Sequence, residues 1–403
     1  MSSCYSISTP PKIIGFLLFL SLIFPTGLMM IKLPLIGLFF LITLLTGARS
    51  CHLRVSTILM SIFFSFVGII WVVYGLSLNN PGALSMLTVM VLYPLLFCFF
   101  CGFYYHEASL SLLRLFIFAG WTLFVIDIMV VIDYVYLNFG FYQVMVNIFG
   151  DNSVVVDNAT RYFKFTIPNI TSLIFILPFL ISSLIFGKVY KSRFALLLLL
   201  ILVAIMSGRR ALLVTMIIAP IISVIITSGV WERRVAWKIL SVFTLFISVI
   251  VVFYSIHPDY FVEMVSNIFN FSDNKSNLER KYQFDALIDG FMLHPIFGNG
   301  AGAVASYIRS DMQPWAYELS YIAFLFQFGI LGILSYFIGF VFIITFLIKQ
   351  VKVKGRDSFE FFYLAGFLSF IMANASNPYL MKFDYMWVIF IPLALYNSCK
   401  VKL

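Results

Sequence analysis

The sequence predicts an all-α polytopic membrane protein, and two properties of its composition indicate that class. Of the 403 residues, 62% are hydrophobic and 11% are charged, whereas an ordinary soluble domain carries about 25% charged residues. The apolar residues also form continuous runs, without the alternation of apolar and polar positions that is typical of membrane β-barrel strands. We therefore expect a single integral membrane domain, residues 1–403, built from α-helices.

Twelve apolar runs are candidates for membrane-spanning helices. A helix rises about 1.5 Å per residue, so about 20 residues cross a bilayer core of about 30 Å. The second and seventh runs are short, and the tenth, with 30 residues, must tilt or extend beyond the lipid. The expected spans are residues 13–31, 33–46, 55–78, 83–104, 115–137, 167–187, 194–206, 211–229, 239–256, 318–347, 359–376 and 385–398.

Positive charge indicates the orientation of these spans. With the N-terminus in the cytoplasm, 16 of the 26 Lys and Arg residues fall in cytoplasmic segments, against four of the 17 carboxylates. Lys and Arg are enriched on the cytoplasmic side of multi-pass proteins. The formal net charge of +9 therefore reflects topology, and it gives no reason to expect nucleic acid as a partner.

One pair of charges lies inside an apolar run. Arg209 and Arg210 are the only charged residues between Phe194 and Gly229, a run of 36 residues that is too long for one crossing. The run must cross twice, which places the turn with the two arginines at or just below the outer surface. An arginine at membrane depth costs at least about 2.5 kcal/mol and usually faces a protein interior or a water-filled cavity. We interpret the pair as an anion site.

Two long outer loops hold most of the other polar residues. The first, residues 138–166, includes Arg161, and the second, residues 257–317, holds eleven charges. Loops longer than about 12–15 residues are usually functional or disordered. The second loop also has a helix signature, because Ser276–Glu279 fits a capping box and an apolar stripe follows as far as His294. We expect it to pack over the outer mouth of the bundle.

Several side chains near this loop are candidates for chemistry. Arg280 lies on the polar face of the expected helix. It is a candidate for a functional role, and the alternative is an ordinary solvated surface residue. Glu318 begins the tenth span, where partial desolvation suits a carboxyl group to proton transfer, and a favourable charge at a helix N-terminus is the alternative. His294, which precedes a proline, is a further candidate, and a purely structural role is the alternative interpretation. Asp127 and Asp133, in the fifth span, are further candidates of the same kind as Glu318.

Two other patterns resemble ligand sites but have a structural interpretation. The glycines of Gly298-Asn-Gly-Ala-Gly302 do not follow a strand, so we expect a flexible turn and not a nucleotide-binding loop. Cys98-Phe-Phe-Cys101 lies inside an apolar span, where small core residues are expected. The histidines lack metal-ligand spacing, so we expect neither a metal nor a cofactor.

In combination, these features resemble the O-antigen ligase and O-antigen polymerase (Wzy-type) family. The resemblance covers roughly Arg161–Leu334 and depends on the order of its motifs. These motifs are Thr166-Ile-Pro-Asn169, Arg210 in a short turn, Arg280 in a long outer loop, His294-Pro-Ile-Phe-Gly-Asn-Gly300, Glu318-Leu-Ser-Tyr321 and Phe328-Gly-Ile-Leu-Gly332.

The resemblance implies a GT-C-like membrane enzyme of the bacterial inner membrane, with its active site facing the periplasm. Such enzymes elongate or attach glycans carried on undecaprenyl diphosphate. It implies that Arg210 and Arg280 neutralise charge on the diphosphate leaving group and that Glu318 is the base, at a position where the ligases have a histidine. The residues expected to bind substrate are Arg209, Arg161, His294 and Tyr321.

The expected function is polysaccharide repeat-unit polymerase, because glutamate replaces the ligase histidine. The expected partners are an undecaprenyl-diphosphate-linked oligosaccharide, membrane lipid and a chain-length regulator protein. An O-antigen ligase, which transfers glycan to lipid A–core, is the nearest alternative. A lipid-linked glycan flippase or transporter is the alternative from another class, but the charges collect near the outer mouth and do not line a path through the bundle.

Overall fold

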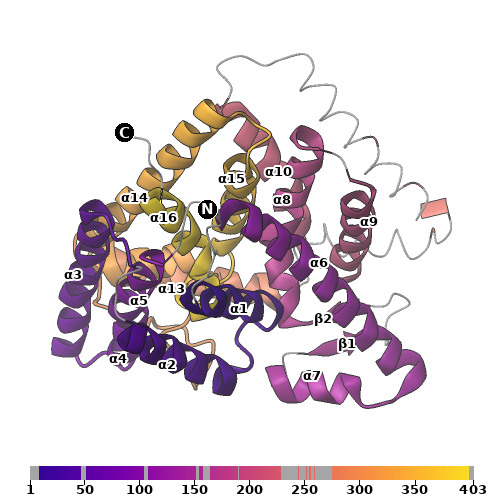
Figure 1. The fold of residues 1–403 in the computed structure, drawn as a ribbon. Coiled ribbons are helices and arrows are strands. Elements are labelled where there is room, and N and C mark those ends of the chain that lie inside the picture. The colour runs from indigo at the N-terminus through magenta and orange to yellow at the C-terminus, as the bar shows by residue number, and fades with distance from the viewer. Residues whose placement is uncertain are drawn as a thin grey trace, which may run out of the picture.

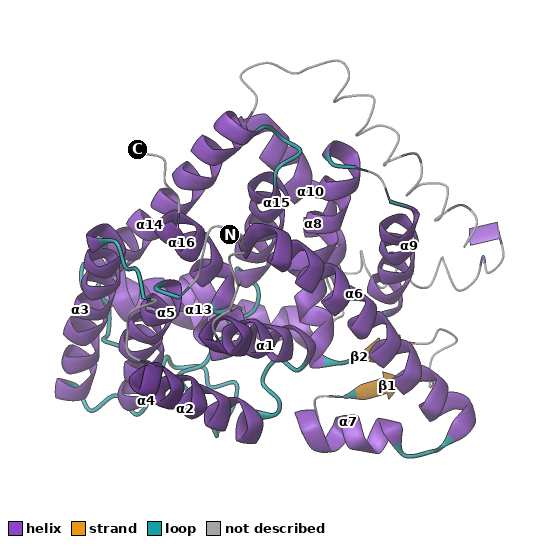
Figure 2. Ribbon diagram, viewed as in Figure 1, coloured by secondary structure: helices purple, strands orange, loops and turns teal. Residues whose placement is uncertain are grey.

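The computed structural model describes residues 9–46, 51–103, 108–150, 154–157, 164–188, 190–227 and 275–398, and the single positions 244, 251, 254, 255 and 258. This part of the chain is a bundle of α-helices with one small sheet (Figures 1 and 2). Six of its helices are long and apolar enough to cross a membrane. The expected class, an all-α membrane protein, is confirmed, while the number of spans stays a prediction.

The described helices, in chain order, are α1 Thr9–Ile23, α2 Met29–Thr46, α3 Val55–Ser77, α4 Ala83–Leu87, α5 Tyr93–Cys101, α6 Ala108–Ile132, α7 Phe141–Phe149, α8 Leu173–Phe186, α9 Lys191–Met206, α10 Arg210–Thr227, α13 Lys275–Leu293, α14 Ser320–Lys354, α15 Phe359–Asn374 and α16 Trp387–Ser398. A helix occurs at each expected run except residues 239–256, most of which lie outside the described residues. Helix α13 confirms the helix expected inside the second long loop.

Short elements complete the fold. A π-helical turn, Thr88–Leu92, joins α4 to α5, and another, Asp133–Leu137, extends α6. Strands β1 (Val155–Asp157) and β2 (Lys164–Thr166) pair antiparallel, with Val156 opposite Phe165. These strands and α7 lie together beside one end of α6 (Figure 1). The described part of the first long loop therefore contains α7 and the two strands.

The expected boundary between the first two spans is wrong. Helix α1 ends at Ile23 and α2 begins at Met29, so Lys32 lies inside α2 and not between two helices. Pro25 and Gly27 lie in the break, where Thr26 has a positive φ of 65°. Lys32 is fully buried. Its ammonium donates to the Oδ1 atom of Asp384 at 2.6 Å, and this ion pair offsets the cost of burying the charge. A charge that is paired inside the protein does not mark the end of a helix.

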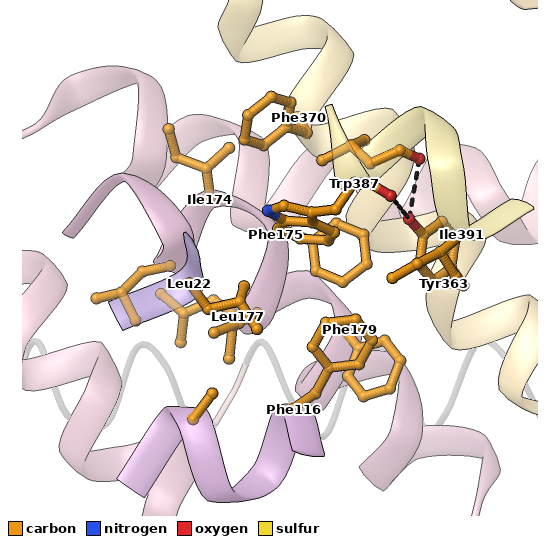
Figure 3. Close-up of a cluster of buried hydrophobic side chains, with 14 of the residues drawn as sticks. Leu22, Phe116, Ile174, Phe175, Leu177, Phe179, Tyr363, Phe370, Trp387 and Ile391 are labelled. Atoms are coloured by element: carbon orange, nitrogen blue, oxygen red, sulfur yellow. Dashed lines mark hydrogen bonds between the residues drawn. The ribbon is translucent and has the colours of Figure 1, made fainter. Parts of the chain in front are cut away.

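Helix α8 forms the centre of the bundle. It is apolar on all faces, as expected for a helix that is covered on every side, and it packs against α10 and α15, which also contact each other. Figure 3 shows its Phe175 and Phe179 among aromatic side chains from α6, α15 and α16. The ring centroids of Phe175 and Trp387 lie 4.7 Å apart in an edge-on arrangement. The hydroxyl of Tyr363 donates to the Val388 carbonyl at 2.9 Å, which ties α15 to α16.

Helix α14 is kinked at Gly329, and the glycine-rich segment after α13 docks at the kink. Gly329 has φ 64° and ψ −172°, a conformation that essentially only glycine adopts. The break leaves the amide groups of Ile330 and Leu331 to donate to carbonyls of residues 295 and 296, at 3.0 and 3.2 Å. A Cβ atom on Gly298 would lie 2.6 Å from backbone atoms of α14. The expected flexible turn is therefore a closely packed joint.

Candidate functional site

Glu318 lies between two arginines immediately before α14. Its Oε2 atom is 2.7 Å from Nε of Arg280 on α13, and its Oε1 atom is 2.6 Å from Nη2 of Arg309 in the preceding loop. The Glu318 side chain is 11% exposed, whereas those of Arg280 and Arg309 are 34% and 41% exposed. Each guanidinium has five N–H donors, so one contact with Glu318 does not exhaust either arginine. The arginines can therefore bind a further anion from the exposed side.

The packing of α13 on α14 fixes this ion-pair cluster. The buried side chain of Gln283 accepts a hydrogen bond from the Glu318 backbone amide at 2.9 Å. At the other end of α13, the side chain of Asn299 donates to the carbonyls of Gly290 and Phe326, at 3.0 and 3.2 Å. Arg280 and Glu318 are thus held by two helices that are tied at both ends of their contact.

The loop that carries Arg309 is also held in place. The Tyr317 hydroxyl accepts a hydrogen bond from the Ala305 amide at 2.6 Å. The side chain of Gln327 donates to the carbonyls of Ala303 and Trp315, at 3.3 and 3.1 Å. These contacts close the segment between residues 303 and 317 against α14, so Arg309 extends from an ordered loop.

Arg209 lies in the short turn between α9 and α10, which Gly208 allows with a φ of 61°. The Arg209 guanidinium donates from Nη1 to the Thr171 hydroxyl at 2.7 Å and from Nη2 to the Ile167 carbonyl at 3.2 Å. Both partners belong to the segment that leads into α8. Arg210 is the first residue of α10 and is half-buried. The turn is therefore anchored on the central helix of the bundle.

The loop between α15 and α16, residues 375–386, lies near Arg209 and near the cluster of Glu318, Arg280 and Arg309. Its Tyr379 side chain lies near enough to Arg209, Glu318 and Arg280 to interact with their charges. Burial raises the pKa of the Tyr379 hydroxyl, so it is protonated near neutral pH. The same loop carries Lys382, which interacts electrostatically with Arg309. The Glu318 carboxylate thus contacts Arg280 and Arg309 and lies near Tyr379 of this loop.

Of the residues expected to be catalytic, the structure brings Arg280 and Glu318 into contact. Arg210, the third, begins α10 beside Arg209, and its role stays a prediction. The expected substrate-binding residues His294 and Tyr321 have other contacts. His294 is exposed at the end of α13, where its carbonyl accepts a hydrogen bond from Gly298 at 2.8 Å. Tyr321, in the first turn of α14, donates from its hydroxyl to the Ile371 carbonyl of α15 at 2.7 Å. Arg161 lies outside the described residues, and its role stays a prediction.

The two aspartates of the fifth span have different surroundings. Asp133 is buried and accepts hydrogen bonds from the amides of Phe139 and Tyr142, at 2.6 and 2.8 Å, so it caps the start of α7. Asp127 is also buried and accepts a 2.7 Å hydrogen bond from Asn169, in the segment before α8. Among the described residues, no group of three or more His, Cys, Asp or Glu side chains could hold a metal ion.

Residues 195–338 match the model of a protein family described as O-antigen ligase. This stretch, about a third of the chain, is similar to the domain of that family. Members of this family are glycosyltransferase-like enzymes of O-antigen synthesis. The matched region includes the α9–α10 turn, α13 and the first half of α14, and therefore contains Arg209, Arg280, Arg309 and Glu318. No curated protein sequence matches the chain.

The match confirms the resemblance to the O-antigen ligase and polymerase family and, with the apolar helices, indicates a multi-pass membrane protein. Sequence reasoning missed Arg309, Tyr379 and Lys382. A signal for Lys382 was present, because Lys382 and Asp384 interrupt the apolar C-terminal region between two expected spans. Tyr379 and Arg309 gave no comparable signal, since only the fold places them beside Arg209 and Glu318.

Proposed function

We propose that the protein is a polysaccharide repeat-unit polymerase of the O-antigen type. It transfers the growing glycan from undecaprenyl diphosphate to the non-reducing end of another lipid-linked repeat unit, at the periplasmic face of the bacterial inner membrane. The observation that carries this proposal is the position of Glu318 between Arg280 and Arg309, immediately before a long apolar helix. Such a cluster suits a lipid with an anionic head group.

The electrostatics of the cluster favour a phosphorylated substrate. Arginine presents a planar fork of donors that matches phosphate oxygens. Asp384 is already paired with Lys32, and among the described residues Glu318 is the one carboxylate in ion-pair contact with Arg280 and Arg309. The site therefore has positive charge to spare, which a diphosphate would balance. A hydrophobic prenyl chain would extend from the diphosphate into the lipid beside the apolar helices.

The proposed reaction is a displacement at the anomeric carbon of the donor sugar. The oxygen of an acceptor hydroxyl forms the new glycosidic bond, and the bond between the anomeric carbon and the diphosphate oxygen breaks. Undecaprenyl diphosphate leaves with the bonding electrons, and the arginines stabilise its charge. The hydroxyl proton passes to Glu318, which can accept it once the diphosphate has taken over the guanidinium of Arg280 or Arg309.

An O-antigen ligase is the second candidate, and the description of the matched family favours it. Both enzymes use the same donor and release the same diphosphate, so the arginine cluster suits either. They differ in the acceptor, which is lipid A–core for the ligase. Glutamate at position 318, in place of the histidine of the ligases that the chain resembles, favours the polymerase.

A deletion strain tests the proposed function. Loss of a polymerase leaves lipopolysaccharide with core plus one repeat unit, whereas loss of a ligase leaves bare core. Wild-type protein should restore the ladder, and Arg280→Ala or Glu318→Ala should not, although both variants reach the membrane in amounts equal to wild type by immunoblot. Lys281→Ala, at the exposed neighbouring position on α13, is the matched control and should restore the ladder. A full ladder from Arg280→Ala and Glu318→Ala would overturn the proposal.

A further inference from the structure

The end of α13 and the turn that follows it present an exposed apolar surface. Four large side chains of this stretch, which we call the apolar tip, are between 54% and 74% exposed: Met292, Leu293, Ile296 and Phe297. No Lys, Arg, Asp or Glu occurs between Asp289 and Arg309. A contiguous exposed apolar surface marks a site of interaction with another protein, a ligand or a membrane. The apolar tip therefore needs a partner.

Hydrogen bonds hold the apolar tip against two helices that are long and apolar enough to cross a membrane, α3 and α14. The Phe297 carbonyl accepts a hydrogen bond from Nε1 of Trp71 in α3 at 2.8 Å. The carbonyls of Pro295 and Ile296 accept hydrogen bonds from the two amides that the kink of α14 leaves free, at 3.0 and 3.2 Å. The tip is thus attached to the sides of both helices and not to their ends.

These attachments indicate how deep the apolar tip lies. Trp71 precedes Ser77, the last residue of α3, by about 9 Å along the helix axis, and the kink at Gly329 follows Ser320, the first residue of α14, by about 14 Å. The hydrocarbon core of a bilayer is about 30 Å thick. If α3 and α14 cross the membrane, the tip therefore lies at the level of the acyl chains.

The backbone of this stretch is paired as a segment without access to water requires. Irregular backbone at membrane depth is tolerated only where the protein satisfies its N–H and C=O groups. The amide of Asn299 donates to the Phe326 carbonyl at 2.9 Å, and the amide of Ala301 donates to the Trp71 carbonyl at 3.1 Å. The side chain of Asn80 donates to the carbonyls of Asn299 and Ala301, at 2.8 and 3.3 Å. A turn in water could bond to solvent instead, so this pairing favours a position inside the bilayer.

The apolar tip also continues the outward face of α14. Beyond the kink, this helix exposes a row of large apolar side chains, which are Ile330, Leu331, Leu334, Phe337 and Ile338. Since α14 has the length and composition of a membrane span, these side chains are expected to face acyl chains. The hydrogen bond between Ile296 and Leu331 places the tip in the same surface. His294, the ionisable residue of the stretch, has an apolar ring with a polar edge, which suits the boundary between lipid and water.

We propose that the apolar tip is inserted among the acyl chains of the bilayer, as a re-entrant end of the second long loop. The partner of this surface is the lipid itself. The loop then does more than pack over the mouth of the bundle, because one end of it is anchored in the membrane. The anchor lies on the same helix as Arg280, so α13 connects the ion-pair cluster to the lipid. This inference does not depend on the proposed reaction.

Fluorescence quenching of the full-length protein in phosphatidylcholine vesicles tests the insertion. A genetically encoded fluorescent amino acid takes the place of Leu293 or Phe297, and its emission is measured with brominated acyl chains and with aqueous iodide as quenchers. The matched controls carry the same fluorophore at Ile338, on the outward face of α14, or at Lys281, at the exposed other end of α13. We expect brominated lipid to quench positions 293 and 297 as strongly as position 338, and iodide to quench position 281 alone.

Two results would overturn the inference. Quenching by iodide at positions 293 and 297 to the extent seen at position 281 would show that the tip lies in water. Protection of both positions from both quenchers would show that protein covers the tip, either a second copy of the chain or another subunit. Each labelled protein must melt at the temperature of the wild type, and where one does not, the label moves to Met292 or Ile296, which belong to the same surface.

Discussion

Replacing Glu318 with glutamine asks whether this carboxylate competes with an anionic ligand for the arginines. Its two oxygens bind Arg280 and Arg309 at 2.7 and 2.6 Å. Glutamine keeps the shape of the side chain and the backbone contact with Gln283, but it removes the charge. In the proposed reaction a diphosphate must take over these guanidinium groups. Glu318→Gln should therefore bind a prenyl diphosphate more tightly than the wild type and should turn over more slowly.

The size of both effects follows from the exposure of the ion pairs. Because the side chains of Arg280 and Arg309 are 34% and 41% exposed, each pair with Glu318 contributes about 0.2–1 kcal/mol. Removing both competitors then lowers the Kd for the diphosphate by about 2- to 30-fold. Loss of a general base lowers turnover by about 10²- to 10⁴-fold. Tighter binding with slower turnover is the combined signature of an internal competitor that also accepts the proton.

Calorimetry with farnesyl diphosphate measures the Kd, and product formation from a lipid-linked repeat unit measures turnover. Asp289→Asn, which removes an exposed carboxylate from α13, is the control for the change in net charge and should leave both quantities unchanged. Weaker binding by Glu318→Gln would refute this reasoning, because it would show that the carboxylate serves to hold the arginines in place.

Three further predictions concern the supports of the site. Lys32→Met leaves Asp384 buried without its ion-pair partner and should cost about 3–5 kcal/mol of stability; the melting temperature should recover in part when Asp384→Leu is added, and no recovery would count against a buried pair. Gly329→Ala forces a strained φ and places a Cβ atom 2.3 Å from a backbone carbonyl, so it should cost more than about 1–3 kcal/mol, whereas Gly37→Ala, with nothing within 4 Å of its Cβ, should not lower the melting temperature. Asp133→Ala removes the cap of α7 and should cost about 0.5–2 kcal/mol, which hydrogen exchange of the α7 amides can measure; unchanged exchange would contradict the capping role.

The sequence predicts helices well where an apolar run ends at residues that face water. Helix α3 was expected at residues 55–78 and extends over Val55–Ser77. The boundary at Lys32 was wrong because its partner, Asp384, lies far away in the sequence, so the pair could not be recognised before the fold was known. The roles of Asp127 and Asp133 could not be told apart from the sequence either. Asp127 accepts a hydrogen bond from Asn169, whereas Asp133 accepts one from the Tyr142 amide, and only the fold shows this difference.

The candidate site was predicted in part for a physical reason. An arginine inside an apolar run is costly in lipid, so Arg209 was conspicuous in the sequence. Glu318 was conspicuous for the same reason, as the last charge before a long apolar helix. Arg309 and Tyr379 belong to polar loops in which such residues are ordinary. Their place in the site depends on the docking of loops against α14 and α15, which the composition of a loop does not reveal.

The proposed activity can be tested most directly with purified protein and a lipid-linked repeat unit as the only substrate. The wild-type protein should convert the single unit into a ladder of longer products and release undecaprenyl diphosphate in step with each added unit. Arg280→Ala should form neither product, while Lys281→Ala should match the wild type. Formation of the ladder by Arg280→Ala at the wild-type rate would show that the arginine and glutamate cluster does not catalyse glycan transfer.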